Sequence, residues 1–84
     1  MKKSAVYYPS GVCSNQYNIT IEDGRVENIE IIGGCPGNLF GISSLIRGMD
    51  AEEAIRRMEG ITCGGKATSC PDQIAKALKE MIEG

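Results

Sequence analysis

Residues Gln16–Ile32 read QYNITIEDGRVENIEII, and this stretch decides the fold. In its first half apolar and polar residues alternate, which is the period-of-two pattern of a strand with one buried face. Asp23-Gly24 then supplies a turn whose residues tolerate positive φ, so the stretch predicts a β-hairpin. The apolar positions of the first strand are Tyr17, Ile19 and Ile21.

The return strand is expected over Arg25–Ile32. Val26 is out of phase with the later isoleucines, which indicates a β-bulge, or burial on both faces near the strand end. Upstream, the β-type run SAVYYP, residues 4–9, stops at Pro9 and predicts a short first strand. Together these segments predict a three-stranded antiparallel meander.

The rest of the sequence predicts three helices. The second is expected to have Asp50 as its N-cap, with Glu53 completing a capping box and Gly60 suited to the C′ position. For the third, either Ser69 or Cys70 is the N-cap, and the pattern leaves both open. The expected ranges are Asn38–Gly48, Ala51–Glu59 and Pro71–Ile82.

Strands followed by helices predict an α+β domain in which the three helices pack on one face of the sheet. The apolar stripes indicate which helix residues face the sheet. In the first helix these are Leu39, Ile42, Leu45, Ile46 and Met49. In the third they are Ile74, Leu78 and Met81. With 84 residues, the chain is expected to form a single domain, residues 1–84.

Composition argues against several partners. The net charge is −2 and no basic patch is visible, so we expect no direct binding of nucleic acid. No apolar run approaches the roughly 20 residues of a membrane span, so no membrane association is expected. The N-terminal stretch MKKSAVYYPS lacks the apolar core of a secretory signal. The expected location is therefore the cytoplasm.

The chain has four cysteines and no histidine. All four fall at the ends of predicted elements, in turns that contain glycine, proline or serine: Cys13, Cys35, Cys63 and Cys70. Disulfides are uncommon in the cytoplasm, so metal ligands or redox thiols are the first interpretation. Cys35 and Cys70 also lie near predicted helix N-termini, where the helix dipole favours a thiolate.

Four thiolates suit a closed tetrahedral zinc site, and an iron–sulfur cluster is the alternative. A disulfide between Cys63 and Cys70, or four buried apolar side chains, would also be compatible with the sequence. The cysteines are 22, 28 and 7 residues apart, without the paired C-x-x-C of zinc ribbons. A metal site would therefore require the fold to bring separate loops together.

Three ordered segments carry a family resemblance: YPSGVCS at 8–14, GGCPGNLFGISSLIRGM at 33–49 and GITCGGKATSCPDQIAKAL at 60–78. Within the third, Thr68–Asp72 spells TSCPD. The chain resembles the stand-alone, four-cysteine small proteins of the TSCPD domain family. In that family the same domain occurs at the C-terminal end of adenosylcobalamin-dependent ribonucleoside-diphosphate reductases.

The resemblance implies that Cys13, Cys35, Cys63 and Cys70 are metal ligands, and that the partner is a ribonucleotide reductase or another protein. The chain is too short for the reductase's catalytic barrel, so we do not expect this oxidoreductase activity from the chain alone. A fainter similarity of layout concerns U-type iron–sulfur scaffold proteins, whose cysteine order is matched by Cys13, Cys35 and Cys70.

These observations predict a small cytoplasmic, zinc-binding accessory domain that docks on a protein partner. Two alternatives remain open. In the first, Cys63 and Cys70 form an exchanging dithiol that relays electrons to a ribonucleotide reductase. In the second, the chain is a scaffold for iron–sulfur cluster assembly.

Overall fold

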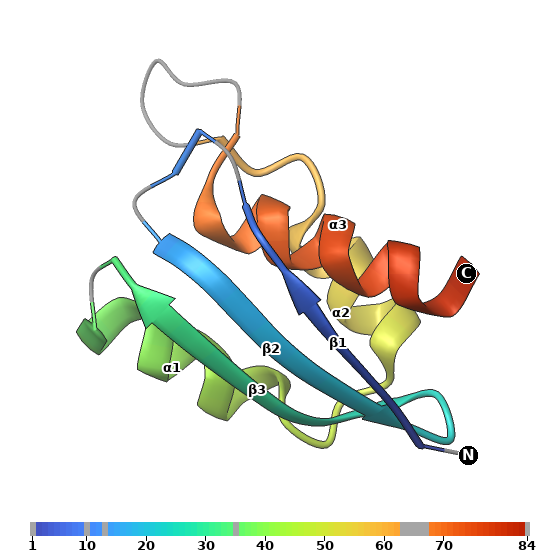
Figure 1. The fold of residues 1–84 in the computed structure, drawn as a ribbon. Helices are drawn as coiled ribbons and strands as arrows, with labels where there is room; N and C mark the ends of the chain where they lie inside the picture. Colours follow the sequence, from blue (N-terminus) through green and yellow to red (C-terminus); the bar gives the residue numbers. More distant parts are fainter. Residues whose placement is uncertain (1, 10, 13, 35, 63–67, 84) are drawn as a thin grey trace.

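The computed structural model describes residues 2–9, 11, 12, 14–34, 36–62 and 68–83, without the side chains of residues 36–39. Three strands come first and three helices follow, which confirms the predicted α+β layout (Figure 1). The strands are β1 (Lys2–Tyr7), β2 (Ser14–Glu22) and β3 (Arg25–Gly33). The helices are α1 (Pro36–Ile46), α2 (Ala51–Met58) and α3 (Cys70–Glu83).

The sheet is an antiparallel meander in the order β1-β2-β3. Asp23 and Gly24 have φ values of 52° and 79°, so the tight turn predicted between β2 and β3 is confirmed. The predicted bulge is also confirmed, because the pairing shifts at Glu27, which is an extra residue in β3. This shift returns Val26 to the buried face, opposite Ile21.

One face of the sheet is buried and the other is polar. The buried positions of β2 and β3 are Tyr17, Ile19, Ile21, Val26 and Ile29. On the opposite face the Ser4 and Thr20 hydroxyls lie 3.1 Å apart, and Asn18 donates to Glu30 at 3.0 Å. This alternation is the pattern of an antiparallel sheet that is covered by other elements on one side.

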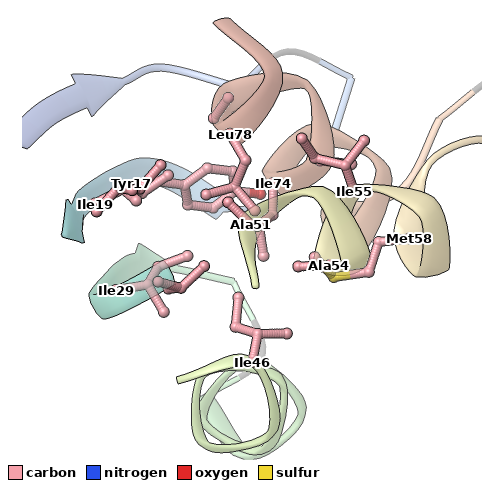
Figure 2. Close-up of a cluster of buried hydrophobic side chains, with 14 residues drawn as sticks. Tyr17, Ile19, Ile29, Ile46, Ala51, Ala54, Ile55, Met58, Ile74 and Leu78 are labelled. Atoms are coloured by element: carbon pink, nitrogen blue, oxygen red, sulfur yellow. The ribbon is translucent and has the colours of Figure 1, made fainter. Parts of the chain in front are cut away.

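All three helices lie on the buried face, as predicted. α3 contacts β1 and β2, α1 packs against β3, and α2 packs against α3. The strands and helices share one hydrophobic core, in which Tyr17 and Ile29 face residues from all three helices (Figure 2). The core side chains of the helices are Ile46, Ala51, Ala54, Ile55, Met58, Ile74, Ala75, Ala77 and Leu78.

α1 ends two residues earlier than the sequence predicts, at Ile46 rather than Gly48. Gly48 has a φ of 85°, and its N–H donates to the carbonyl of Val26 at 2.6 Å. The chain therefore leaves the helix in order to pair with the start of β3. The prediction that Leu45 packs on the sheet was wrong, since this side chain is 76% exposed. The side chain of Leu39 lies outside the described residues.

α2 and α3 follow their predictions closely. The Asp50 carboxylate accepts from the backbone N–H of Glu53 at 3.3 Å, which confirms the N-cap of α2. The predicted capping box was wrong, because the Glu53 carboxylate pairs with Arg56 and Arg57 rather than with the backbone N–H of Asp50. Gly60 has a φ of 86°, as expected of a C′ glycine. In α3, Ile74 and Leu78 are fully buried, and Met81 packs at the edge of the core. None of the helices described is both long and apolar enough to cross a membrane.

Candidate functional site

The TSCPD stretch lies where α3 begins, and its serine settles which residue caps that helix. The Ser69 hydroxyl accepts from the backbone N–H of Asp72 at 3.2 Å, so Ser69 is the N-cap. The same hydroxyl donates to the carbonyl of Ile61 at 2.7 Å. Ser69 therefore fixes the start of α3 against the segment that follows α2.

Cys70 is the first residue of α3 and is partly buried. Its Sγ lies 3.4 Å from the hydroxyl of Ser14, the first residue of β2. Ser14 is itself buried and lies 2.7 Å from the phenol oxygen of Tyr17. The Tyr17 hydroxyl also donates to the Cys70 carbonyl at 3.5 Å. These contacts hold the thiol at the point where β2 begins.

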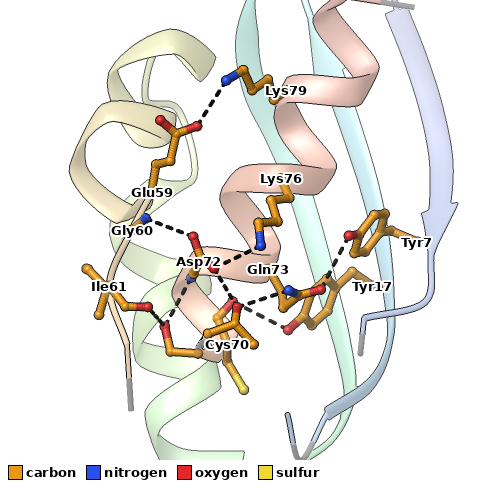
Figure 3. A network of polar contacts seen from close by, with 12 residues as sticks. Tyr7, Tyr17, Glu59, Gly60, Ile61, Cys70, Asp72, Gln73, Lys76 and Lys79 are labelled. Carbon is orange, nitrogen blue, oxygen red and sulfur yellow. Dashed lines mark hydrogen bonds and ion pairs between the residues drawn. The ribbon is translucent and has the colours of Figure 1, made fainter. Parts of the chain in front are cut away.

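Asp72 is only 4% exposed, and its carboxylate has hydrogen-bond and ion-pair partners. Its carboxylate accepts from the backbone N–H of Gly60 at 2.8 Å and from the Thr68 hydroxyl at 2.5 Å. Lys76 lies 3.3 Å away, one helical turn on (Figure 3). The hydrogen bond from Thr68, and then that from Gly60, lowers the pKa of Asp72 below its ordinary value. Asp72 is therefore an ionised residue that joins the end of α2 to the start of α3.

Gln73 extends this network to the sheet. Its side-chain N–H donates to the Thr68 hydroxyl at 3.0 Å, and its carbonyl oxygen accepts from the Tyr7 hydroxyl at 3.3 Å. The Tyr7 ring stacks on that of Tyr17, with 6.1 Å between the ring centroids. Figure 3 shows these side chains converging on the first turn of α3. The network ties β1 and β2 to the TSCPD stretch.

Asp72 and Gln73 fall in the first turn of the predicted helix over residues 71–82, and the structure shows that both also contact residues far away in the sequence. No local pattern predicts that Asp72 holds the N–H of Gly60, because that contact depends on how α2 and α3 pack. The contact between Ser14 and Cys70 was also missed. The one signal for it was the position of Ser14 directly after Cys13.

Of the four predicted site residues, the structure describes Cys70 alone. Cys13, Cys35 and Cys63 lie outside the described residues. Within the described ranges, no group of three or more histidine, cysteine, aspartate or glutamate residues is placed to hold a metal ion. The prediction of a four-cysteine cluster therefore stays a prediction.

The described neighbours of the predicted ligands lie at one end of the molecule. Ser14 pairs with Gly33, so the start of β2 and the end of β3 meet there. A Cβ built on Gly11 would come within 3.2 Å of the Thr68 methyl group, which lies two residues before Cys70. The contact between Ser14 and Cys70 links these segments to the start of α3.

The position of Cys70 at a helix N-terminus favours a negative charge on its sulfur. Cys70 opens a helix of 14 residues, whose N-terminal N–H groups and dipole stabilise negative charge. Asp72 is the nearest carboxylate along the chain, but Gly60, Thr68 and Lys76 already engage it. Among the described residues at this end of the fold, the sulfur of Cys70 can therefore act as a donor without displacing these contacts of Asp72.

Comparison with known proteins gives one match. The model of the TSCPD domain matches residues 2–82, which is nearly the whole chain. No curated protein and no solved structure matches the sequence. Because the matched region covers all three strands, α1, α2 and all but the last residue of α3, the chain belongs to the TSCPD domain family.

Proposed function

We propose that this protein is a zinc-binding accessory domain, with Cys13, Cys35, Cys63 and Cys70 as the ligands. The observation that carries the proposal is the meeting of Ser14, Gly33 and Cys70 at one end of the fold. Cys13 directly precedes Ser14, and Cys35 follows Gly33 by two residues. Consecutive Cα atoms are about 3.8 Å apart, so Cys13 and Cys35 must both lie close to the point where Ser14 pairs with Gly33.

The described residues on either side of Cys63 lie close together. Ile61 stands before it and Ser69 after it, and the two are joined by the hydrogen bond of 2.7 Å from the Ser69 hydroxyl to the Ile61 carbonyl. Both ends of the segment are thus held beside Cys70, which supports counting Cys63 among the ligands.

The donor set fits zinc. Four cysteine thiolates make the closed tetrahedral site that is typical of structural zinc, and the chain contains no histidine to replace any of them. Bound zinc would supply folding free energy by holding together segments that are far apart in sequence. The role proposed for the metal is therefore structural, and the domain would act through a partner.

The proposed partner is a ribonucleotide reductase, the class of enzyme that carries this domain at its C-terminal end. An apolar groove of about 270 Å³ beside the start of α3 supports docking on another protein. Leu45 and Ile61, which line it, are 76% and 44% exposed. The lining residues are Ile42, Leu45, Ile46, Met49, Ala54, Arg57, Met58, Ile61 and Pro71.

Elemental analysis with thiol titration on freshly purified protein tests the metal site. The expected result is one zinc per chain, a colourless solution and thiols that react only after unfolding. Iron with sulfide and a brown colour would instead indicate a cluster. A folded, metal-free protein whose thiols titrate freely and oxidise reversibly would favour the dithiol relay, and would reject the zinc site.

Two variants make this test specific. Cys70→Ser removes one ligand with little change of shape, and we expect zinc content to fall well below one per chain. Ser44→Ala is the matched control, because Ser44 is an exposed residue of α1 and removing its hydroxyl should leave zinc content unchanged. Equal zinc content in both variants would contradict the assignment of Cys70 as a ligand.

A further inference from the structure

Within the part of the chain that the structure describes, the sheet is open along the outer edge of β1. Among the residues that the structure describes, β1 pairs with β2 alone. The opposite edge is partly covered, because Val26 in β3 exchanges hydrogen bonds with Gly48 and Met49 after α1. An open edge strand presents backbone N–H and C=O groups that can pair with a further strand. β1 therefore offers an uninterrupted edge at which this sheet can grow, whereas the edge of β3 is interrupted at Val26.

An apolar slot runs beside this edge. It has a volume of about 200 Å³ and lies between β1 and α3. Its lining residues are Ala5, Val6, Tyr7, Ile19, Ala77, Glu80 and Met81. When an open edge adjoins an apolar pocket, an added strand gains both main-chain hydrogen bonds and a place for its side chains.

The faces of β1 restrict how a second strand can pair. Lys3, Ala5 and Tyr7 share the inner face, because their partners on β2 are buried residues. Directly opposite residues of an antiparallel pair point to the same face. A symmetric pair of β1 strands centred on Ala5 obeys this rule, and it places Lys3 of each copy opposite Tyr7 of the other.

The charges around the slot are complementary under this arrangement. Glu80 lines the slot together with Tyr7, and after burial it is the main cause that raises the pKa of Tyr7. Lys3 of a second copy would arrive beside this carboxylate and over the Tyr7 ring. Lysine at an edge ordinarily deters pairing, but here it would meet an acid twice in one symmetric interface.

The two α3 helices would also have room. α3 runs antiparallel to β1, since Tyr7 bonds Gln73 near the helix start and Lys3 bonds the Met81 carbonyl near its end. Ala5 is therefore level with the small residue Ala77. α3 contacts both β1 and β2, so it lies behind the β1 edge and not over it. If the β1 strands of the two copies are about 4.8 Å apart, the two α3 helices are about 10 Å apart, which is an ordinary helix packing distance.

We propose that two copies of this chain pair through their β1 strands, in antiparallel fashion about Ala5, to form one continuous six-stranded sheet. Lys3 of each copy binds Glu80 of the other, and the two α3 helices pack side by side across the two-fold axis. This dimer does not depend on the proposed metal site, which would lie at the opposite end of β2 from the hairpin turn.

Charge exchange tests the proposal by sedimentation of the full chain over a range of concentrations. Lys3→Glu and Glu80→Lys are each expected to raise the dimer dissociation constant about tenfold, because each places two like-charged pairs in the interface. The double variant exchanges the charges and should restore the wild-type constant. Glu83→Lys makes the same charge change elsewhere on α3 and is expected to have little effect.

Three outcomes would overturn the proposal. One is a wild-type chain that stays monomeric at millimolar concentration, which would leave the edge for an extended segment of another protein. Another is a dimer that is unaffected by either single variant. The third is a double variant whose dimer dissociation constant is no lower than those of the single variants. Far-UV circular dichroism of each variant checks that it is folded, since Lys3 and Glu80 are both exposed.

Discussion

Replacing Asp72 with asparagine should destabilise the protein by about 2–3 kcal/mol. The side chain is buried, and its two oxygens accept from Gly60 and Thr68 while Lys76 lies within ion-pair distance. Asparagine has nearly the same shape but only one acceptor oxygen. If that oxygen keeps the Gly60 N–H, the amide NH₂ is turned toward two other donors, the Thr68 hydroxyl and the Lys76 ammonium.

The magnitude follows from the kind of bond that is lost. A hydrogen bond to a charged group contributes about 1.5–3 kcal/mol, and the part-buried Thr68 hydroxyl that loses its acceptor adds a desolvation cost. The ion pair with half-exposed Lys76 adds less than about 1 kcal/mol. For a domain of this size, the expected change lowers the melting temperature by roughly 10–15 °C.

The assay is urea unfolding at neutral pH, with the zinc content of each preparation measured alongside. Asp50→Asn is the matched control, because Asp50 is an exposed N-cap and asparagine caps a helix about as well. A loss of less than about 0.5 kcal/mol in Asp72→Asn, or an equal loss in the control, would refute the reasoning.

The pH dependence gives a second check on the same residue. The pKa of Asp72 in the folded protein is lowered from 3.8, so the ionised side chain contributes to the free energy of unfolding above that pH. The contribution is lost as the pH falls through the lowered pKa. The stability difference between the wild type and Asp72→Asn should therefore narrow on acidification. A difference that stays constant down to the lowest pH at which the wild type folds would contradict the assignment.

Further predictions concern packing, backbone and docking. Ile74→Ala should cost about 3 kcal/mol in urea unfolding because Ile74 is fully buried, whereas Ile32→Ala should cost well under 1 kcal/mol at a side chain 42% exposed. Gly33→Ala should be more destabilising than Gly24→Ala in thermal unfolding. Both glycines have positive φ, but only at Gly33 would a Cβ clash, 2.5 Å from a side-chain nitrogen; equal losses would argue against the clash. Leu45→Glu should leave stability unchanged and weaken binding to a purified ribonucleotide reductase in a calorimetric titration; unchanged binding would exclude this groove as the docking surface.

The sheet was largely predictable because its signals are local. Alternation identified β2, Asp23-Gly24 identified the turn, and the phase of Val26 indicated the bulge at Glu27. The second irregularity, where the pairing shifts at Asn15, was not foreseen. It depends on Gly33 leaving space for the Asn15 side chain, and no single segment of sequence records that relation.

The helices show where such reasoning fails. Leu45 fits an apolar stripe of α1. The helix packs on β3 with the other part of this stripe, so the part that contains Leu45 faces solvent. The site was predictable to the extent that Cys70 opens α3 beside Ser69. The long-range partners of Asp72 and Gln73 were not, because they come from loops and strands that only the packed structure brings together.

The polar network around Gln73 also bears on how the chain folds as it is synthesised. Tyr7 and Tyr17 emerge early from the ribosome, but their partner at the start of α3 follows more than fifty residues later. Until then the inner face of β1 and β2 lacks the helix that covers it, so it remains open to solvent and to other nascent chains. β1 and β2 are therefore covered only after α3 has been synthesised, and a chain terminated after α2 should be a substrate for chaperones and proteases.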